Sequence, residues 1–222
     1  MIRAVFWDND GVLVDTEKLY FQATRELLLR AGVNLTQTLF QQISLREGRS
    51  AFDLAEKKGI PREEIARIQE ERNHRYTELL AGGVRVLDGV REALGALRGR
   101  VTLGIVTSSR RVHFEAIHAG TDLLPWFDFV LAREDYGLSK PDPEPYRMAV
   151  KKSGFAPEEC VAVEDSERGL QSALSAGIRC LVVPNELTRG GSFDGAWRIV
   201  SGAGEVPAEI RRMDGVRPAR AD

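Results

Sequence analysis

Four short polar segments in the sequence follow stretches that are predicted to be strands. They are Asp8-Asn9-Asp10-Gly11, Thr107-Ser108-Ser109, Lys140-Pro141 and Glu164-Asp165. Their side chains supply carboxylates, hydroxyl groups and an amine, which together can attack a phosphorus atom, bind its oxygens and neutralise its charge. Because the segments lie far apart in the sequence, they can act together only if the fold gathers them at one place.

Asp8 comes directly after an apolar stretch and is the candidate nucleophile. Its carboxylate would repel a phosphate dianion unless a cation neutralised that charge. Mg²⁺ prefers oxygen ligands and commonly binds through one or two carboxylates together with phosphate oxygens. Asp8 and Asp165, with help from Glu164, are therefore candidate ligands for Mg²⁺. Lys140 is expected to add a further positive charge beside the nucleophile and the phosphate.

Asp10 lies two residues beyond Asp8, so the two side chains point to the same side if the chain stays extended there. Asp10 is then placed to protonate a leaving oxygen and later to accept a proton from water, which is general acid–base catalysis. Gly11 permits a turn that lets the loop approach a ligand closely. Thr107 and the backbone N–H of Ser108 are expected to donate hydrogen bonds to phosphoryl oxygens.

The elements that must position these residues follow from the hydrophobic pattern. Short apolar runs at residues 2–7, 101–106, 129–131, 160–163 and 180–183 predict strands. Helical periodicity at residues 90–97, from Pro143 to Gly154 and at 170–177 separates them. This alternation predicts an α/β fold with a doubly wound, Rossmann-like parallel sheet. Ligands bind such sheets beyond the carboxyl ends of the strands, where the four polar segments fall.

One region departs from the alternation of strands and helices. Residues 16–82 contain no convincing strand, and their apolar residues recur at helical spacing. We therefore expect an all-helical domain at 16–82, inserted into a core formed by 1–15 and 83–222. The polar segment 214–222 contains Pro218 and is expected to fray.

Bulk composition excludes several classes of function. The formal net charge is -2 and the sequence is 43% hydrophobic, so no overall field draws the protein to nucleic acid or to an anionic membrane. No stretch approaches the roughly 20 apolar residues that span a bilayer. No signal peptide is evident, which makes a cytoplasmic location the default. Cys160 and Cys180 lie in predicted strands and are expected to be reduced core residues.

The four segments together resemble the haloacid dehalogenase superfamily, whose members are mostly phosphatases. Residues 6–17, FWDNDGVLVDTE, are similar to the family's FDxDGxLxDTE motif. The strand ending at Thr107, the segment from Lys140 to Tyr146 and the segment 164–169, EDSERG, resemble its other three motifs. The resemblance implies a Mg²⁺ ion held by the carboxylate of Asp8, the backbone carbonyl of Asp10, and the acids Glu164 and Asp165.

The resemblance also implies that the helical insertion is a cap of the type found in the subgroup that contains beta-phosphoglucomutase. Residues 44–50 look like the specificity loop of such a cap, so Arg46 and Arg49 are candidate ligands for a second anionic group of the substrate. Asn9 replaces a more frequent Leu and is expected to face the cap or solvent. Asn9 and Ser108 complete the candidate substrate-binding residues.

Several chemistries occur in this superfamily. Dehalogenases and phosphonatases lack the second Asp of the first motif, so Asp10 argues against both. Beta-phosphoglucomutase places a His early in the first cap helix, where this chain has Tyr20; the three histidines of the chain are expected to decorate helices. The favoured hypothesis is hydrolysis of a small phosphorylated metabolite through an aspartyl phosphate on Asp8. The metabolite is expected to be a sugar phosphate or a sugar-acid phosphate. A phosphosugar mutase and a non-catalytic binding protein are the alternatives, and a monomer is expected.

Overall fold

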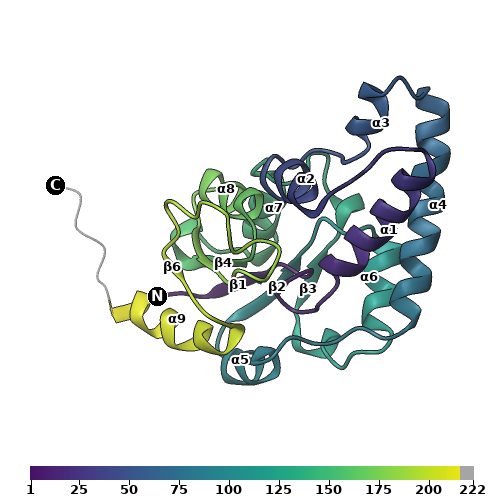
Figure 1. The fold of residues 1–222 in the computed structure, drawn as a ribbon. Coiled ribbons are helices and arrows are strands. Elements are labelled where there is room, and N and C mark those ends of the chain that lie inside the picture. Colours follow the sequence, from purple (N-terminus) through teal and green to yellow (C-terminus); the bar gives the residue numbers. More distant parts are fainter. Residues whose placement is uncertain (216–222) are drawn as a thin grey trace.

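A six-stranded parallel sheet forms the centre of the computed structural model, which describes residues 1–215 (Figure 1). The strand order is β3-β2-β1-β4-β5-β6. The strands are β1 (Ala4–Trp7), β2 (Thr102–Val106), β3 (Phe129–Leu131), β4 (Cys160–Glu164), β5 (Arg179–Val182) and β6 (Arg198–Ile199). The predicted doubly wound α/β fold is confirmed. β6 was not predicted, because its two residues are exposed and form no apolar run.

The alternation of side chains along β1 explains why helices cover both faces of the sheet. Val5 and Trp7 belong to one buried cluster, while Ala4 and Phe6 belong to another. The first cluster is closed by α5 (Val90–Leu97), α6 (Arg111–His118) and α9 (Val206–Gly215). The second is closed by α7 (Glu144–Ser153) and α8 (Glu167–Ser175). α5 and α9 accordingly lie across the sheet from α7 and α8 (Figure 1).

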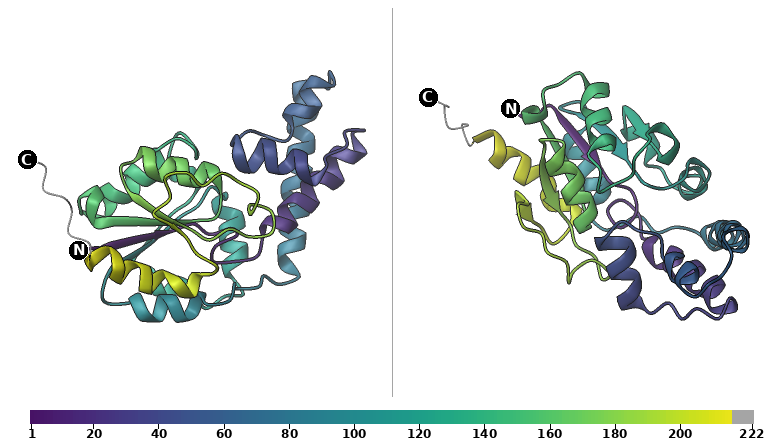
Figure 2. Two further views of the ribbon diagram at one scale, coloured as in Figure 1. Left: turned by 60° about the vertical axis from the view of Figure 1, so that its left-hand side comes forward. Right: turned by 90° about the horizontal axis from the view of Figure 1, so that it is seen from above.

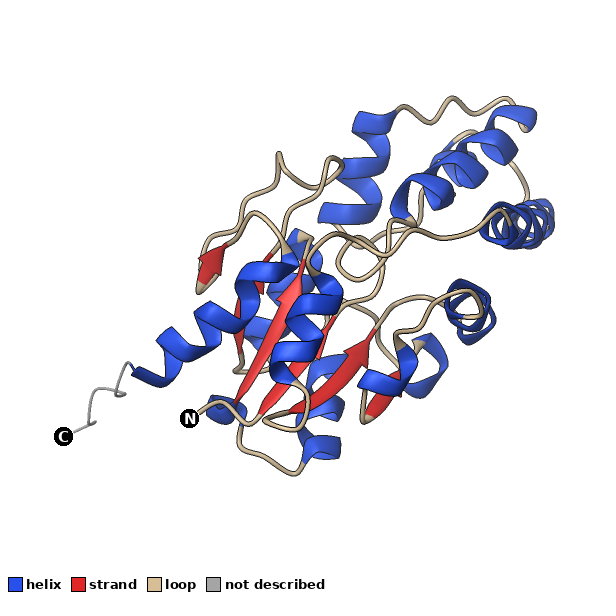
Figure 3. Ribbon diagram, turned by 90° about the horizontal axis from the view of Figure 1, so that it is seen from below, coloured by secondary structure: helices blue, strands red, loops and turns tan. Residues whose placement is uncertain are grey.

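The helical insertion comprises α1 (Glu17–Arg30), α2 (Gln37–Phe40), the π-helical turn η1 (Gln41–Arg46), α3 (Asp53–Lys57) and α4 (Arg62–Ala81). It has an apolar cluster of its own, which includes Leu28, Leu35, Phe40 and Phe52. The arrowheads of the strands point toward the side of the molecule where these helices lie (Figures 2 and 3). The exact domain limits stay a prediction.

Short 3-10 helices lie within some of the connections: η2 (Leu124–Trp126), η3 (Arg133–Asp135), η4 (Pro157–Glu159) and η5 (Ala203–Glu205). Asp214 and Gly215 close α9 instead of fraying, and residues 216–222 of the predicted frayed tail lie outside the described residues. Cys160 and Cys180 are free and buried, as predicted. Within residues 1–215, every helix is too short or too polar to cross a membrane.

Candidate active site

Lys140 joins the ends of three neighbouring strands, β2, β1 and β4. Its Nζ atom donates hydrogen bonds to Asp8 Oδ1 at 2.7 Å, to Glu164 Oε1 at 2.5 Å and to the backbone carbonyl of Val106 at 2.8 Å. These bonds use all three donors of an ammonium group. Burial acts to lower the pKa of Lys140, but the charges of Asp8 and Glu164 outweigh it and raise that pKa. Lys140 is therefore a fixed cation between two acids.

Glu164 ends β4 and is held from several sides. Its Oε1 atom also accepts a hydrogen bond from the Tyr146 hydroxyl at 2.6 Å. Its Oε2 atom is buried and has no hydrogen-bond partner within residues 1–215. A Cβ atom at Gly169 would lie 1.9 Å from this oxygen, so only glycine fits there. Glu164 thus has one oxygen fixed by Lys140 and one that can bind a further group.

Asp8, Glu164 and Asp165 form a buried acidic cluster, in which one carboxylate oxygen from each lies within 4.8 Å of the others. Asp165 Oδ2 accepts a hydrogen bond from Asn185 Nδ2 at 2.6 Å. Gly11 has a φ of 81°, and a Cβ atom there would lie 2.4 Å from Asp165 Oδ2, so glycine lets the first loop approach this acid.

The electrostatics of the cluster favour a bound cation. Burial, together with the charges of Glu164 and Asp10, raises the pKa of Asp8 to about 7 in spite of Lys140. Burial likewise raises the pKa of Asp165 above its ordinary value, and neighbouring acids add to this effect. Lys140 pairs with two of the three buried carboxylates, Asp8 and Glu164, and Glu164 Oε2 is unpaired within residues 1–215. Oxygen ligands of this kind and charge fit Mg²⁺.

Asp10 is the most extensively hydrogen-bonded acid of the site. Its Oδ1 atom accepts from Thr16 Oγ1 at 2.5 Å. Its Oδ2 atom accepts from Ser109 Oγ at 2.7 Å, Thr107 Oγ1 at 3.2 Å and Asn9 Nδ2 at 3.3 Å. The structure therefore brings Thr107 to Asp10, whereas the sequence predicted a contact between Thr107 and the phosphate.

The predicted placement of Asn9 at the cap or in solvent is wrong. Asn9 is fully buried, and its Oδ1 atom lies 2.8 Å from Nε2 of His118 on α6. Asn9 is not among the residues that line the pocket, so it is not placed to bind substrate. The three histidines were expected to decorate helices. This prediction is wrong for two of them, because His113 and His118 are buried and only His74 is exposed.

His118 gives a first testable prediction, on the pH dependence of stability. Burial lowers the pKa of His118 from 6.5 to about 4, although the charge of Asp10 acts to raise it. Between these values the unfolded chain binds a proton that the folded protein does not, so stability is complete above about pH 6.5 and is lost as the pH falls toward 4. This loss is at most about 3 kcal/mol, at 1.36 kcal/mol for each pKa unit.

The measurement is urea unfolding of the wild type and of His118→Gln from pH 7 to pH 4 without Mg²⁺. Asp8 contributes an opposite slope, because its raised pKa makes the folded protein the better proton acceptor. This slope is common to both proteins and cancels in their difference. The difference in the free energy of unfolding between the wild type and His118→Gln should decrease as the pH falls. His74→Gln, at an exposed histidine of α4, is the control. A difference that is constant with pH would contradict the prediction.

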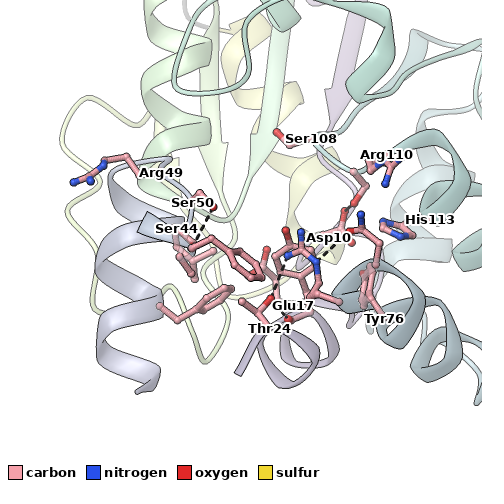
Figure 4. A pocket seen from close by; sticks show the side chains of 18 of the residues that line it. Asp10, Glu17, Thr24, Ser44, Arg49, Ser50, Tyr76, Ser108, Arg110 and His113 are labelled. Atoms are coloured by element: carbon pink, nitrogen blue, oxygen red, sulfur yellow. Dashed lines mark hydrogen bonds between the residues drawn. The ribbon is translucent and has the colours of Figure 1, made fainter. Parts of the chain in front are cut away.

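A pocket lies between this end of the sheet and the helical insertion (Figure 4). Asp8, Asp10 and Ser108 line it from the core, which agrees with their predicted place at the strand ends. Tyr20 and Phe52 line it from the insertion. The pocket therefore joins the acidic cluster to a surface that the insertion supplies.

Of the two arginines predicted to bind substrate, Arg46 lies outside the pocket, and Arg49 lines it with its guanidinium held by a neighbouring acid. Arg46 pairs with Glu167 of α8, with Nε 3.0 Å from Oε1, and donates to the carbonyl of Gly190. It connects the insertion to the core outside the pocket. Arg49 lines the rim of the pocket, but its guanidinium donates to Asp53 at 2.7 Å and points away from Asp10 (Figure 4).

Three charged residues that line the pocket are not among the site residues predicted from the sequence. The guanidinium carbon of Arg72 lies 4.5 Å from the centre of the Tyr20 ring. Arg168 lines the pocket with a buried Nε atom, and Glu17 with a buried Oε2 atom; neither atom has a partner within residues 1–215. Burial, together with Asp10 and Asp8, raises the pKa of Glu17 to about 8, against the charge of Arg168. One sequence feature could have identified Arg168 as a site residue: it lies inside the segment EDSERG, three residues after Asp165.

The sequence profile of the haloacid dehalogenase-like hydrolases matches residues 2–177. The chain belongs to this family, as the four motifs predicted. It is 35% identical over 183 residues to the phosphorylated carbohydrates phosphatase of Thermotoga maritima, an alignment that covers 80% of this chain and 82% of that one. This relationship makes the chain an enzyme of the phosphoric monoester hydrolase class.

Two solved structures extend the comparison. A variant of CbbY from Rhodobacter sphaeroides, in complex with xylulose-1,5-bisphosphate, superposes with a TM-score of 0.78 at 26% identity and covers 92% of this chain and 96% of that chain. A Thermotoga maritima protein provisionally named beta-phosphoglucomutase has a TM-score of 0.72 at 28% identity and covers 95% and 99%. The chain therefore falls in the beta-phosphoglucomutase-like subgroup of the family.

Proposed function

We propose that the chain is a Mg²⁺-dependent phosphatase of small sugar phosphates that acts through an aspartyl phosphate on Asp8. The observation that carries this proposal is the bridge made by Lys140 between Asp8 and Glu164, at the sheet edge where Asp165 and Asp10 also lie. Asp8 and Asp10 line the pocket, and Lys140, Glu164 and Asp165 lie beside Asp8.

Asp8 would act first. Lys140 occupies its Oδ1 atom, which leaves Oδ2 to attack phosphorus. As the bond between Asp8 and phosphorus forms, the bond to the sugar oxygen breaks, and Asp10 gives its proton to that leaving oxygen. The charge of Lys140 lowers the repulsion between the carboxylate and the incoming phosphate.

Hydrolysis of the aspartyl phosphate would complete the cycle. A water molecule attacks phosphorus and gives its proton to Asp10, and the bond between phosphorus and Asp8 breaks. Inorganic phosphate leaves, while Asp8 is again a carboxylate and Asp10 again carries its proton. Asp8, Glu164, Asp165 and the backbone carbonyl of Asp10 would hold the Mg²⁺ ion, which neutralises negative charge on the phosphate when bound.

The residues of the pocket favour a polar, anionic substrate. Arg72 lines the pocket with its guanidinium carbon 4.5 Å from the centre of the Tyr20 ring, and its guanidinium can donate to an anionic or hydroxyl group. Glu17 Oε2 and Arg168 Nε are buried without hydrogen-bond partners within residues 1–215, and both residues line the same pocket. Buried polar atoms of this kind need partners. Sugar hydroxyl groups provide such partners. The names of the Thermotoga phosphatase and of the CbbY complex point to the same class of substrate.

The test is release of inorganic phosphate from a panel of ketose and aldose phosphates, ketose bisphosphates and sugar-acid phosphates, with and without Mg²⁺. We expect turnover that disappears in EDTA and returns with Mg²⁺. Arg72→Ala should raise KM by about tenfold or more if it binds an anionic group, while Arg46→Ala is the matched control outside the pocket. Conversion of one sugar phosphate to an isomer without phosphate release would indicate a mutase. Binding of panel compounds without any reaction would indicate a non-catalytic protein.

A further inference from the structure

A row of buried polar side chains leads away from Asp10 into α6. Asn9 Nδ2 lies 3.3 Å from Asp10 Oδ2, and Asn9 Oδ1 lies 2.8 Å from His118 Nε2. His118 Nδ1 lies 2.8 Å from Thr121 Oγ1. Asn9 and His118 are both buried, and neither of them lines the substrate pocket. Polar groups in such a place destabilise a core unless each is hydrogen-bonded.

The two ends of the row allow one orientation of the Asn9 amide. Its oxygen cannot face Asp10 Oδ2, because that atom already accepts from Ser109 and Thr107 and offers no donor to it. The amide nitrogen therefore faces Asp10, and the amide oxygen accepts a hydrogen bond from Nε2–H of His118. Burial keeps His118 neutral by lowering its pKa to about 4, so its Nδ1 atom accepts from the Thr121 hydroxyl. His118 thereby fixes which end of Asn9 meets the acid.

This arrangement makes the two oxygens of Asp10 unequal. Oδ2 accepts from three side chains, Ser109, Thr107 and Asn9, while Oδ1 accepts from Thr16. Each carboxylate oxygen has about two lone-pair sites. Oδ2 is therefore saturated, and Oδ1 keeps capacity for one more partner on the acid that lines the pocket.

We propose that Asn9 and His118 are positioning residues that hold the Asp10 carboxylate so that Oδ1 carries the transferred proton. The role rests on the phosphatase reaction proposed above. Oδ1 gives its proton to the sugar oxygen as the bond between that oxygen and phosphorus breaks. Oδ1 takes a proton back from the water molecule that displaces Asp8 from phosphorus. Oδ2 keeps its three donors through both steps, so the carboxylate does not rotate.

The variants must separate positioning from folding. Asn9→Leu alone leaves the buried Nε2–H group of His118 without its acceptor, which is expected to destabilise the fold. The double variant Asn9→Leu/His118→Leu replaces both partners with apolar side chains, which can be nearly neutral for stability. His118→Leu and His118→Gln form a second pair. Gln keeps a donor for Asn9, whereas Leu removes it.

The measurement is the burst rate of phosphoenzyme formation with two probes, the best sugar phosphate of the panel and p-nitrophenyl phosphate. A sugar alkoxide needs a proton to leave, while nitrophenolate leaves readily without one. We expect the double variant and His118→Leu to form phosphoenzyme about tenfold more slowly from the sugar phosphate, as for loss of one hydrogen bond to a charged group. The rate with p-nitrophenyl phosphate and both KM values should stay near those of the wild type. His118→Gln should behave like the wild type with both probes.

Equal slowing with both probes would overturn the proposal, because it would indicate a general disturbance of the site. Unchanged rates with both probes would overturn it too. If the double variant does not fold, His118→Leu is compared with His118→Gln using the same two probes. Equal rates of phosphoenzyme formation in these two variants contradict the proposal. A wild type that hydrolyses neither probe would instead contradict the phosphatase function itself.

Discussion

Replacing Asp8 with Asn is expected to abolish turnover, with a fall in kcat on the order of 10⁴-fold or more, as for removal of other catalytic nucleophiles. An amide cannot form the phosphorylated intermediate that a carboxylate forms. The fold should survive, because Lys140 keeps its bonds to Glu164 and to the carbonyl of Val106. Removal of a buried carboxylate whose pKa is raised to about 7 should also leave the metal-free protein at least as stable at neutral pH.

The measurement combines steady-state phosphate release with urea unfolding and with a search for a phosphorylated peptide by mass spectrometry. Asp15→Asn is the matched control, since Asp15 belongs to the same loop but pairs with Arg85 away from the pocket. The control should keep wild-type turnover, and the peptide that contains Asp8 should be phosphorylated in the wild type and not in Asp8→Asn. Substantial turnover by Asp8→Asn would remove Asp8 as the nucleophile.

The gathering of polar side chains around Asp8 could be predicted because it depends on the ends of buried strands. Neighbouring parallel strands pair in a fixed register: Val5 of β1 pairs with Leu103 of β2 and with Val161 of β4. Their carboxyl ends therefore meet at one edge, wherever they lie in the sequence. The apolar runs in the sequence predict where the strands lie. Backbone pairing of these strands then brings together the residues that follow them. The acidic cluster and the nearby Thr107 follow from this logic.

Residues whose partners come from tertiary packing could not be anticipated in the same way. Nothing in the local sequence of Asn9 shows that His118, 109 residues later, would face it inside the core. Arg46 was assigned to substrate from its place in the insertion, yet Glu167 of α8 holds it. In each case a polar side chain satisfies a buried or half-buried partner on a distant element, and hydrophobic periodicity carries no information about such pairs. Such tertiary pairs, in the helical insertion and in the core, are therefore less predictable than the sheet edge.

Lys140→Met is expected to destabilise the protein by about 3–5 kcal/mol, as for removal of one partner from a buried ion pair. The side chain is only 2% exposed, and its ammonium group is the cation that Asp8 and Glu164 share. Met fills a similar volume, so the expected loss reflects charge and hydrogen bonding more than packing. Urea unfolding in EDTA at pH 7 measures this loss. Lys18→Met is the matched control, because Lys18 pairs with Glu186 on the exposed surface.

The pH and metal dependence of the same variant identify the cause of its instability. The charge of Lys140 acts to lower the pKa of Asp8, so that pKa rises further in Lys140→Met. The folded variant then binds protons more tightly than the unfolded chain, and its stability must fall as the pH rises above about 4. The fall must continue above pH 7, where the contribution of Asp8 levels off in the wild type. A cation at the acidic cluster replaces part of the lost charge, so saturating Mg²⁺ should restore about 2–3 kcal/mol at a hundred times its Kd. A variant that is destabilised equally at all pH values, and that Mg²⁺ does not stabilise, would show that Lys140 supports packing and does not balance the charge of Asp8 and Glu164.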